Sequence, residues 1–167
     1  ESFDNYDVVV LSDYNKGVLT TDWFKKPENT TVFLDPKKSF INFNRCDIIT
    51  PNLNELKQLS GDNIASEDDI KESCDKILKK YNLKYIIAKR GSEGITIIGK
   101  NDYVKHLKAR FVKNADVTGA GDTVISSISL AFTVTNDILK STEFAINASA
   151  LAVSKPGTAL VTINEIN

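Results

Sequence analysis

The sequence predicts an α/β protein built on a mostly parallel sheet. Short apolar runs recur along the chain, and stretches with helical periodicity separate them, which is the pattern of successive βαβ units. The chain has 167 residues, of which 41% are hydrophobic and 26% charged. A chain of this size and composition can bury a core without disulfides or metals, so we expect one domain over residues 1–167.

The strands are expected where the apolar runs are continuous, as in strands that are buried on both faces. They are residues 7–12, 31–34, 47–50, 85–88 and 159–162. Alternating segments at 94–98 and 103–107 predict a hairpin that turns at 99–102.

Helices are expected between the strands, each with a recognisable start. Asn52 with Glu55, and Ser66 with Asp69, have the spacing of capping boxes. The predicted helices cover residues 52–59, 66–81, 120–134 and 142–153, with a weaker stretch at 20–26.

The charge balance excludes several classes of function. Lys+Arg 21 against Asp+Glu 22 give a net charge of −1, so there is no broad basic field for nucleic acid or an anionic membrane. No apolar run is long enough to span a bilayer and no signal peptide opens the chain, which favours a cytoplasmic protein. Cys46, Cys74 and His106 are too dispersed for a metal site or a disulfide framework. The chain begins at Glu1 and contains no methionine, so we expect a piece of a longer protein or a processed product.

Polar turns follow four of the predicted strands. They lie at Asp13, Asp35, Asn52 and Lys89. In a parallel sheet these turns share one edge, beyond the carboxyl ends of the strands, which is where such sheets bind ligands.

The turn before residue 120 carries the strongest chemical signal. Gly119 and Gly121 allow a tight turn, and the helix that starts there adds its positive dipole end, so the turn suits an anion of phosphate size. The Asp122 carboxylate would repel a phosphate, but it could deprotonate a hydroxyl that attacks a phosphoryl group held by the neighbouring amides. The alternative is an ordinary helix start, with Asp122 favouring the dipole. A dinucleotide fingerprint is excluded because Val124 stands where its third glycine would be, and no P-loop Lys-Ser/Thr pair follows.

Two further turns admit two interpretations each. Residues 52–55 could be a helix cap, or they could hold Mg²⁺ through water beside a nucleotide. The segment 88–94, with Lys89, Arg90 and two glycines, could neutralise a polyphosphate or form a solvated turn.

In these motifs the sequence resembles the PfkB, or ribokinase-like, family of carbohydrate kinases. Residues 116–123 resemble the family's second signature, residues 52–55 its Asn-x-x-Glu motif, and Gly91 to Gly94 its nucleotide-binding glycines. Residues 147–150 and 155–158 resemble the segments that flank the adenine. The resemblance covers almost the whole chain and implies a three-layer α/β/α fold, of which residues 1–167 would be the C-terminal half, with the nucleotide site and the catalytic base.

The resemblance also implies a role for individual residues. Asp122 would be the catalytic base, and Gly119, Ala120 and Gly121 would form the anion hole. The ATP-binding residues would be Asn52, Leu53, Asn54, Glu55, Lys89, Gly91, Gly94, Asn147 and Gly157. Of these, Asn52 and Glu55 would hold Mg²⁺, through water.

Within the family, four segments resemble the kinases that phosphorylate D-glycero-β-D-manno-heptose 7-phosphate at O1 for lipopolysaccharide core synthesis. They are residues 11–17, 34–37, 50–55 and 116–125. The implied partners are ATP, the phosphorylated sugar, the preceding half of the kinase domain and, in the full-length parent, a second copy of the chain. Most sugar-binding residues of the family lie in that preceding half, so we expect negligible kinase activity from this chain by itself. Without that half, the strand at residues 8–11 would lack a neighbour and lie at an exposed edge of the sheet. Another PfkB sugar or nucleoside kinase, and an inactive nucleotide-binding fragment, remain open.

Overall fold

The computed structural model describes residues 3, 5–14, 16, 19, 24–37 and 45–166. The chain divides into two compact units, one of residues 1–90 with 96–105 and the other of residues 91–95 with 106–167. The boundaries between the units fall after residues 90, 95 and 105, and the sequence has no linker-like segment at any of these positions.

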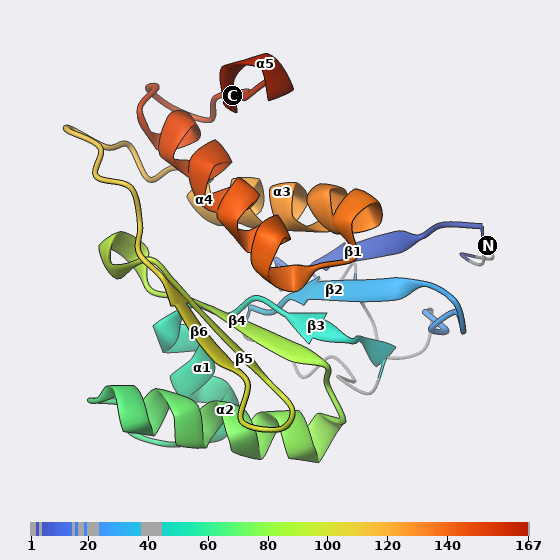
Figure 1. Cartoon of the computed structure of the whole chain (residues 1–167). Helices are drawn as coiled ribbons and strands as arrows, with labels where there is room; N and C mark the ends of the chain where they lie inside the picture. The colour runs from blue at the N-terminus through green and yellow to red at the C-terminus, as the bar shows by residue number, and fades with distance from the viewer. Residues whose placement is uncertain are drawn as a thin grey trace. The chain divides into compact units, whose positions relative to one another are not determined.

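Six strands form one sheet, in the order β1-β2-β3-β4-β5-β6 (Figure 1). They are β1 (Val8–Ser12), β2 (Thr31–Asp35), β3 (Ile48–Ile49), β4 (Tyr85–Lys89), β5 (Ile95–Gly99) and β6 (Val104–Leu107). The first four strands are parallel neighbours, and the turns that precede β5 and β6 are too short for a parallel crossover. The predicted α/β class with a mostly parallel sheet is confirmed.

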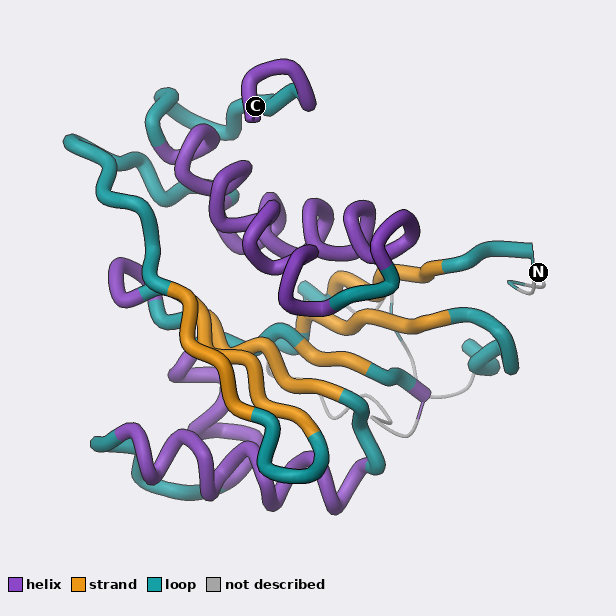
Figure 2. The backbone as a smooth tube through the Cα atoms, in the orientation of Figure 1, coloured by secondary structure: helices purple, strands orange, loops and turns teal. Residues whose placement is uncertain are grey.

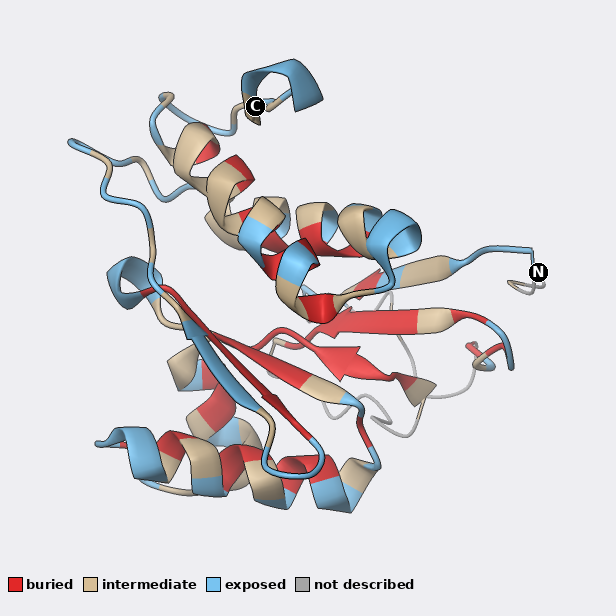
Figure 3. Ribbon diagram, in the orientation of Figure 1, coloured by how far each residue is buried: buried red, intermediate tan, exposed pale blue. Residues whose placement is uncertain are grey.

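Burial along the strands follows their place in the sheet. The apolar residues of β2, β3 and β4 are buried, whereas β6 is largely exposed (Figure 3). β1 stands at the other end of the strand order, and its Val10 is 38% exposed. The expected exposed edge at the first strand is therefore present among the described strands.

Helices α1 (Leu53–Ser60) and α2 (Glu67–Tyr81) lie together on one face of the sheet, against β4 (Figure 1). Each starts with the predicted capping box, because Asn52 pairs with Glu55 and Ser66 pairs with Asp69. α2 buries Ile70, Cys74, Ile77 and Leu78, all in the core cluster beneath the sheet. Cys46 and Cys74 are buried, and burial raises the pKa of each thiol to about 12.

In the second unit, α3 (Ala120–Thr135) packs against α4 (Ile138–Val153). α4 begins earlier than the predicted residue 142, because the Asp137 carboxylate accepts hydrogen bonds from the amides of Leu139 and Lys140 and so caps the helix there. No helix within the described ranges has both the length and the apolarity to cross a membrane.

Two local predictions were wrong, as the backbone trace shows (Figure 2). Residues 159–162 form no strand. Instead, the amide and hydroxyl of Thr162 both donate to Glu165, which turns the chain into the short helix α5 (Ile163–Ile166). Residues 24–26 of the expected weak helix are not helical, and residues 20–23 lie outside the described part of the chain.

Candidate functional site

The carboxyl edge of β2–β4 gathers charged side chains around the buried Asp35. The Asp35 Oδ1 accepts hydrogen bonds from the Thr50 hydroxyl at 2.9 Å and from the Lys89 ammonium at 2.5 Å. Asp35 itself is 0% exposed. The amide of Asp13, which follows β1, donates to the Asp35 carbonyl at 3.2 Å. The turns after β1, β2, β3 and β4 therefore meet at one edge, as the sequence predicts.

Lys37 extends this group toward α1. Its ammonium lies 3.2 Å from Asp35 Oδ2 and 3.4 Å from Glu55 Oε1. Burial lowers the pKa of Lys37, but the two carboxylates outweigh that effect and hold the pKa above its ordinary value. We call Asp35, Lys37, Thr50, Glu55 and Lys89 the carboxyl-edge cluster.

The Asn52–Glu55 motif forms the N-terminal cap of α1. The Asn52 side chain accepts from the Glu55 amide at 2.9 Å, and the Glu55 carboxylate accepts from the Asn52 amide at 2.7 Å. Leu53 packs against the core, and Asn54 is exposed. The cap interpretation of this motif is confirmed.

The same motif retains some capacity for a metal. Glu55 Oε2 is used by the cap, whereas Oε1 has only the long contact with Lys37 among the interactions described above. Within the described residues no three His, Cys, Asp or Glu side chains are grouped to hold a metal ion. Mg²⁺ keeps several waters and needs only one or two carboxylates beside nucleotide phosphates. The residues fit a Mg²⁺ bound through water better than one enclosed by protein ligands.

The turn after β4 uses both of its cations internally. The Lys89 side chain is only 12% exposed because its ammonium pairs with Asp35. Arg90 forms two hydrogen bonds with the Glu67 carboxylate at the start of α2 and donates to the Thr96 hydroxyl. Neither cation is therefore presented to solvent, as the polyphosphate interpretation of this turn would require.

Gly91 begins a single 3₁₀ turn, Gly91–Glu93, and Gly94 follows it; the two glycines have different surroundings. Gly94 has φ +105°, and a Cβ there would lie 2.0 Å from the Leu107 carbonyl oxygen. The close approach of that backbone therefore requires a glycine at position 94. Gly91 has φ +61° and open space around it.

The Gly119–Asp122 turn is the start of α3. Gly119 is its N-cap residue, with φ 74°, and a Cβ there would lie 3.3 Å from Thr158 Cγ2. The amide of Ala120 donates to the Val117 carbonyl at 3.1 Å. The amide of Gly121 lies in the first turn, where a helix supplies no carbonyl acceptor. Asp122 is exposed in that same turn.

Asp116 connects this turn to the Gly157 turn. One carboxylate oxygen accepts from the Thr118 amide at 3.0 Å, and the other accepts from the Gly157 amide at 2.7 Å. The bond from the Thr118 side chain, followed by those two amides, lowers the pKa of Asp116. The two turns that the family resemblance assigns to the catalytic base and to the adenine side are thereby held together.

The predicted site residues thus form two groups. Asn52, Glu55 and Lys89 are joined in the first unit, where Asn52 and Lys89 also form an isolated parallel bridge. Gly119, Ala120, Gly121, Asp122 and Gly157 are neighbours in the second unit, and Asn147 is half-buried within α4.

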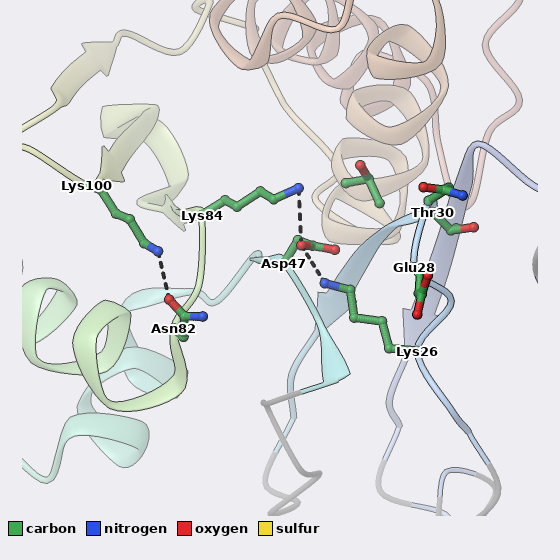
Figure 4. A pocket seen from close by; sticks show the side chains of 9 residues that line it. Lys26, Glu28, Thr30, Asp47, Asn82, Lys84 and Lys100 are labelled. Atoms are coloured by element: carbon green, nitrogen blue, oxygen red, sulfur yellow. Dashed lines mark hydrogen bonds and ion pairs between the residues drawn. The ribbon is translucent and has the colours of Figure 1, made fainter.

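A polar pocket of about 370 Å³ lies at the opposite, amino edge of β2–β4 (Figure 4). Asp47 is central to it and pairs with Lys26 at 2.6 Å and Lys84 at 3.3 Å, while Lys100 bonds Asn82. Burial raises the pKa of Asp47, but Lys26, the Val32 amide and Lys84 outweigh it, so the net pKa is lowered. None of the predicted site residues lines this pocket.

The sequence places Asp35 at the ligand edge of the sheet, but it does not indicate Asp35, Lys37 or Thr50 as individual site residues. The available signal was Asp35-Pro36-Lys37 directly after a buried strand, since a carboxylate at the end of a central parallel strand faces the ligand edge. Lys37 has no comparable local signal, because its second partner, Glu55, lies on a different element.

The sequence of the chain matches known proteins over nearly all of its length. The sequence profile of the pfkB family carbohydrate kinases matches residues 7–165. The bifunctional protein HldE of Syntrophotalea carbinolica is 31% identical over 173 residues, covering 99% of this chain and 35% of that protein. HldE of Sulfurimonas denitrificans is 36% identical over 168 residues, covering 96% and 35%. The chain thus spans about a third of the length of these relatives.

Solved structures give the same result for the fold. Ribokinase from Thermotoga maritima superposes with a TM-score of 0.80 at 25% identity, covering 96% of this chain and 55% of that chain. Arabidopsis thaliana ribokinase, solved with ribose and ATP, gives a TM-score of 0.72 at 25% identity, covering 77% and 43%. With the profile match over nearly all of its residues, this chain belongs to the PfkB family of carbohydrate kinases.

Proposed function

We propose that the protein containing this chain is an ATP-dependent kinase that phosphorylates O1 of D-glycero-β-D-manno-heptose 7-phosphate. The observation that carries the proposal is the identity of 31% and 36% to HldE proteins over nearly the whole chain, including the motifs that resemble the heptose kinases. The site geometry supports the kinase chemistry, because Asp122 stands at the glycine-rich start of α3.

In the proposed reaction Asp122 accepts the proton of the sugar hydroxyl. The hydroxyl oxygen then attacks the γ-phosphorus of ATP, the bond from that phosphorus to the bridging oxygen breaks, and ADP leaves. The start of α3, with the amides of Gly119 to Gly121, would hold the transferred phosphoryl group by its dipole. Because the Ala120 amide already donates to Val117, its use in this hole requires that bond to open.

The remaining predicted residues would bind ATP and its Mg²⁺. Asn52 and Glu55 would hold a hydrated Mg²⁺, which neutralises charge on the nucleotide phosphates when it is bound. Gly91 and Gly94 would lie along the phosphates, with Lys89 as a nearby cation, and Asn147 and Gly157 would lie near the adenine. The ammonium of Lys89 is held by Asp35, so we assign it a contribution through charge and not through a direct contact.

The likeness to ribokinases favours a second candidate, another sugar as the phosphoryl acceptor. A substrate panel on the intact protein with Mg-ATP separates the two. We expect heptose 7-phosphate to give the highest kcat/KM, with ³¹P NMR showing a new phosphate on the anomeric carbon. Higher turnover of ribose or another sugar would contradict heptose 7-phosphate as the substrate and would still support a sugar kinase. ATP binding without turnover of any sugar would contradict the kinase itself.

A further inference from the structure

Lys37 occupies a position between two buried carboxylates that belong to different elements. Asp35 ends β2, and Glu55 lies in the first turn of α1. The Lys37 ammonium is 3.2 Å from an oxygen of the first and 3.4 Å from an oxygen of the second. A position that is shared by two carboxylates is one that a cation of any kind would favour.

The two lysines of the carboxyl-edge cluster are held differently. Lys89 is 12% exposed and lies 2.5 Å from Asp35 Oδ1, as expected for a charge-assisted hydrogen bond. Lys37 is 34% exposed, and both of its contacts are longer than the usual 2.7–2.9 Å or so of such bonds. Lys89 is therefore the tightly held counter-charge of Asp35, while Lys37 reaches in from solvent on a flexible stem.

Lys37 is the described cation that compensates the negative charge of Glu55. Glu55 as a residue is 7% exposed, and the other described partner of its carboxylate is the backbone amide of Asn52 in the cap. A buried carboxylate with one amide and no cation would be costly. Lys37 supplies that charge from outside the helix.

We propose that the Lys37 ammonium is a displaceable counter-ion, which occupies the cation position between Asp35 and Glu55 and leaves it when a divalent cation binds there. A divalent ion carries twice the charge to the same two carboxylates, and the long Lys37 contacts cost little to break. The released ammonium stays at the carboxyl edge. In the kinase that we propose above, on which this last step rests, it is then free to meet a phosphate.

The test uses Mn²⁺ alone, with the intact protein and without nucleotide or sugar. Calorimetric titration compares the wild type with Lys37→Met, Lys37→Arg and the matched control Lys57→Met, which removes a lysine from α1 outside the cluster. Lys37→Met should bind Mn²⁺ roughly tenfold more tightly, because affinity for such ions follows the net charge of the site. Lys37→Arg and Lys57→Met should match the wild type, and adding Glu55→Gln to Lys37→Met should abolish the gain. Equal affinity in Lys37→Met, or a gain that survives Glu55→Gln, would overturn the proposal.

A second measurement needs no variant. Reductive methylation of the wild-type protein, followed by peptide mass spectrometry, reports how accessible each lysine is. Mg²⁺ should increase the labelling rate of Lys37 and leave that of Lys57 unchanged, whereas an unchanged rate at Lys37 would contradict displacement. Neither measurement involves phosphoryl transfer. A failed kinase assay would therefore not contradict the displacement of Lys37, and a failed displacement test would not contradict the kinase function.

Discussion

Lys89 and Asp35 form a buried ion pair between the carboxyl ends of β4 and β2, with 2.5 Å between Lys89 Nζ and Asp35 Oδ1. Their side chains are 12% and 0% exposed. The pair connects positions far apart in the sequence at the edge where a parallel sheet binds its ligands. Its strength therefore bears on both the stability of the first unit and the geometry of the candidate site.

Removing one partner of this pair should destabilise the protein more than removing both. Asp35→Asn leaves the Lys89 ammonium without its partner, and Lys89→Met leaves the buried Asp35 with the longer Lys37 contact at 3.2 Å as its one described ion pair. Either change should cost roughly 3 kcal/mol, whereas the double variant should recover at least half of that loss. Urea unfolding measures each free energy. Lys76→Met, which breaks the exposed pair with Asp62 at 3.3 Å, is the control and should cost less than about 1 kcal/mol. Additive losses in the double variant would show that the pair is not coupled.

Asn52 can be tested for its two roles separately. Serine is as good an N-cap as asparagine, so Asn52→Ser should leave stability unchanged while Asn52→Ala loses about 1 kcal/mol. If the side-chain amide of Asn52 also helps to bind Mg-ATP, as we propose, Asn52→Ser should raise the KM for Mg-ATP roughly tenfold. That change is the equivalent of one lost hydrogen bond. Steady-state kinetics on the intact protein decide this. An unchanged KM in Asn52→Ser would contradict a role in ATP binding and limit Asn52 to capping α1.

Asp47 should contribute to the acid sensitivity of the fold. Its pKa is lowered in the folded state, although burial opposes this, because Lys26, the Val32 amide and Lys84 favour the carboxylate. Its stabilising effect is therefore complete above the unfolded pKa of about 3.9 and is lost as the pH falls through the lower folded value. Asp47→Asn should be less stable at pH 7, and the difference in unfolding free energy from the wild type should shrink as the pH falls below about 4. Curves that stay parallel from pH 7 to pH 3 would contradict this.

The sequence predicted those features that depend on local patterns and on parallel topology. Strand ends at Asp35 and Lys89 had to share an edge once β2 and β4 were parallel, and the capping box at Asn52 follows from spacing alone. The missed features depend on distances between elements. The contact between Lys37 and Glu55 needs the position of α1 relative to β2, which no pattern in either segment encodes.

The error at residues 159–162 has a similar origin. An apolar run becomes a strand only if another strand is available to pair with it. Here the Glu165 carboxylate instead accepts both the amide and the hydroxyl of Thr162. Glu165 lies beyond the apolar run, so the run itself could not indicate the outcome.

The most direct test of the kinase account is the turnover number of the intact Asp122→Asn protein with Mg-ATP and heptose 7-phosphate. The matched control is Asp68→Asn, which removes an exposed carboxylate from the first turn of α2. Loss of a general base should lower kcat by at least about 10²-fold in Asp122→Asn, with an unchanged unfolding free energy, while Asp68→Asn keeps wild-type turnover. A folded Asp122→Asn protein with wild-type kcat would contradict the account.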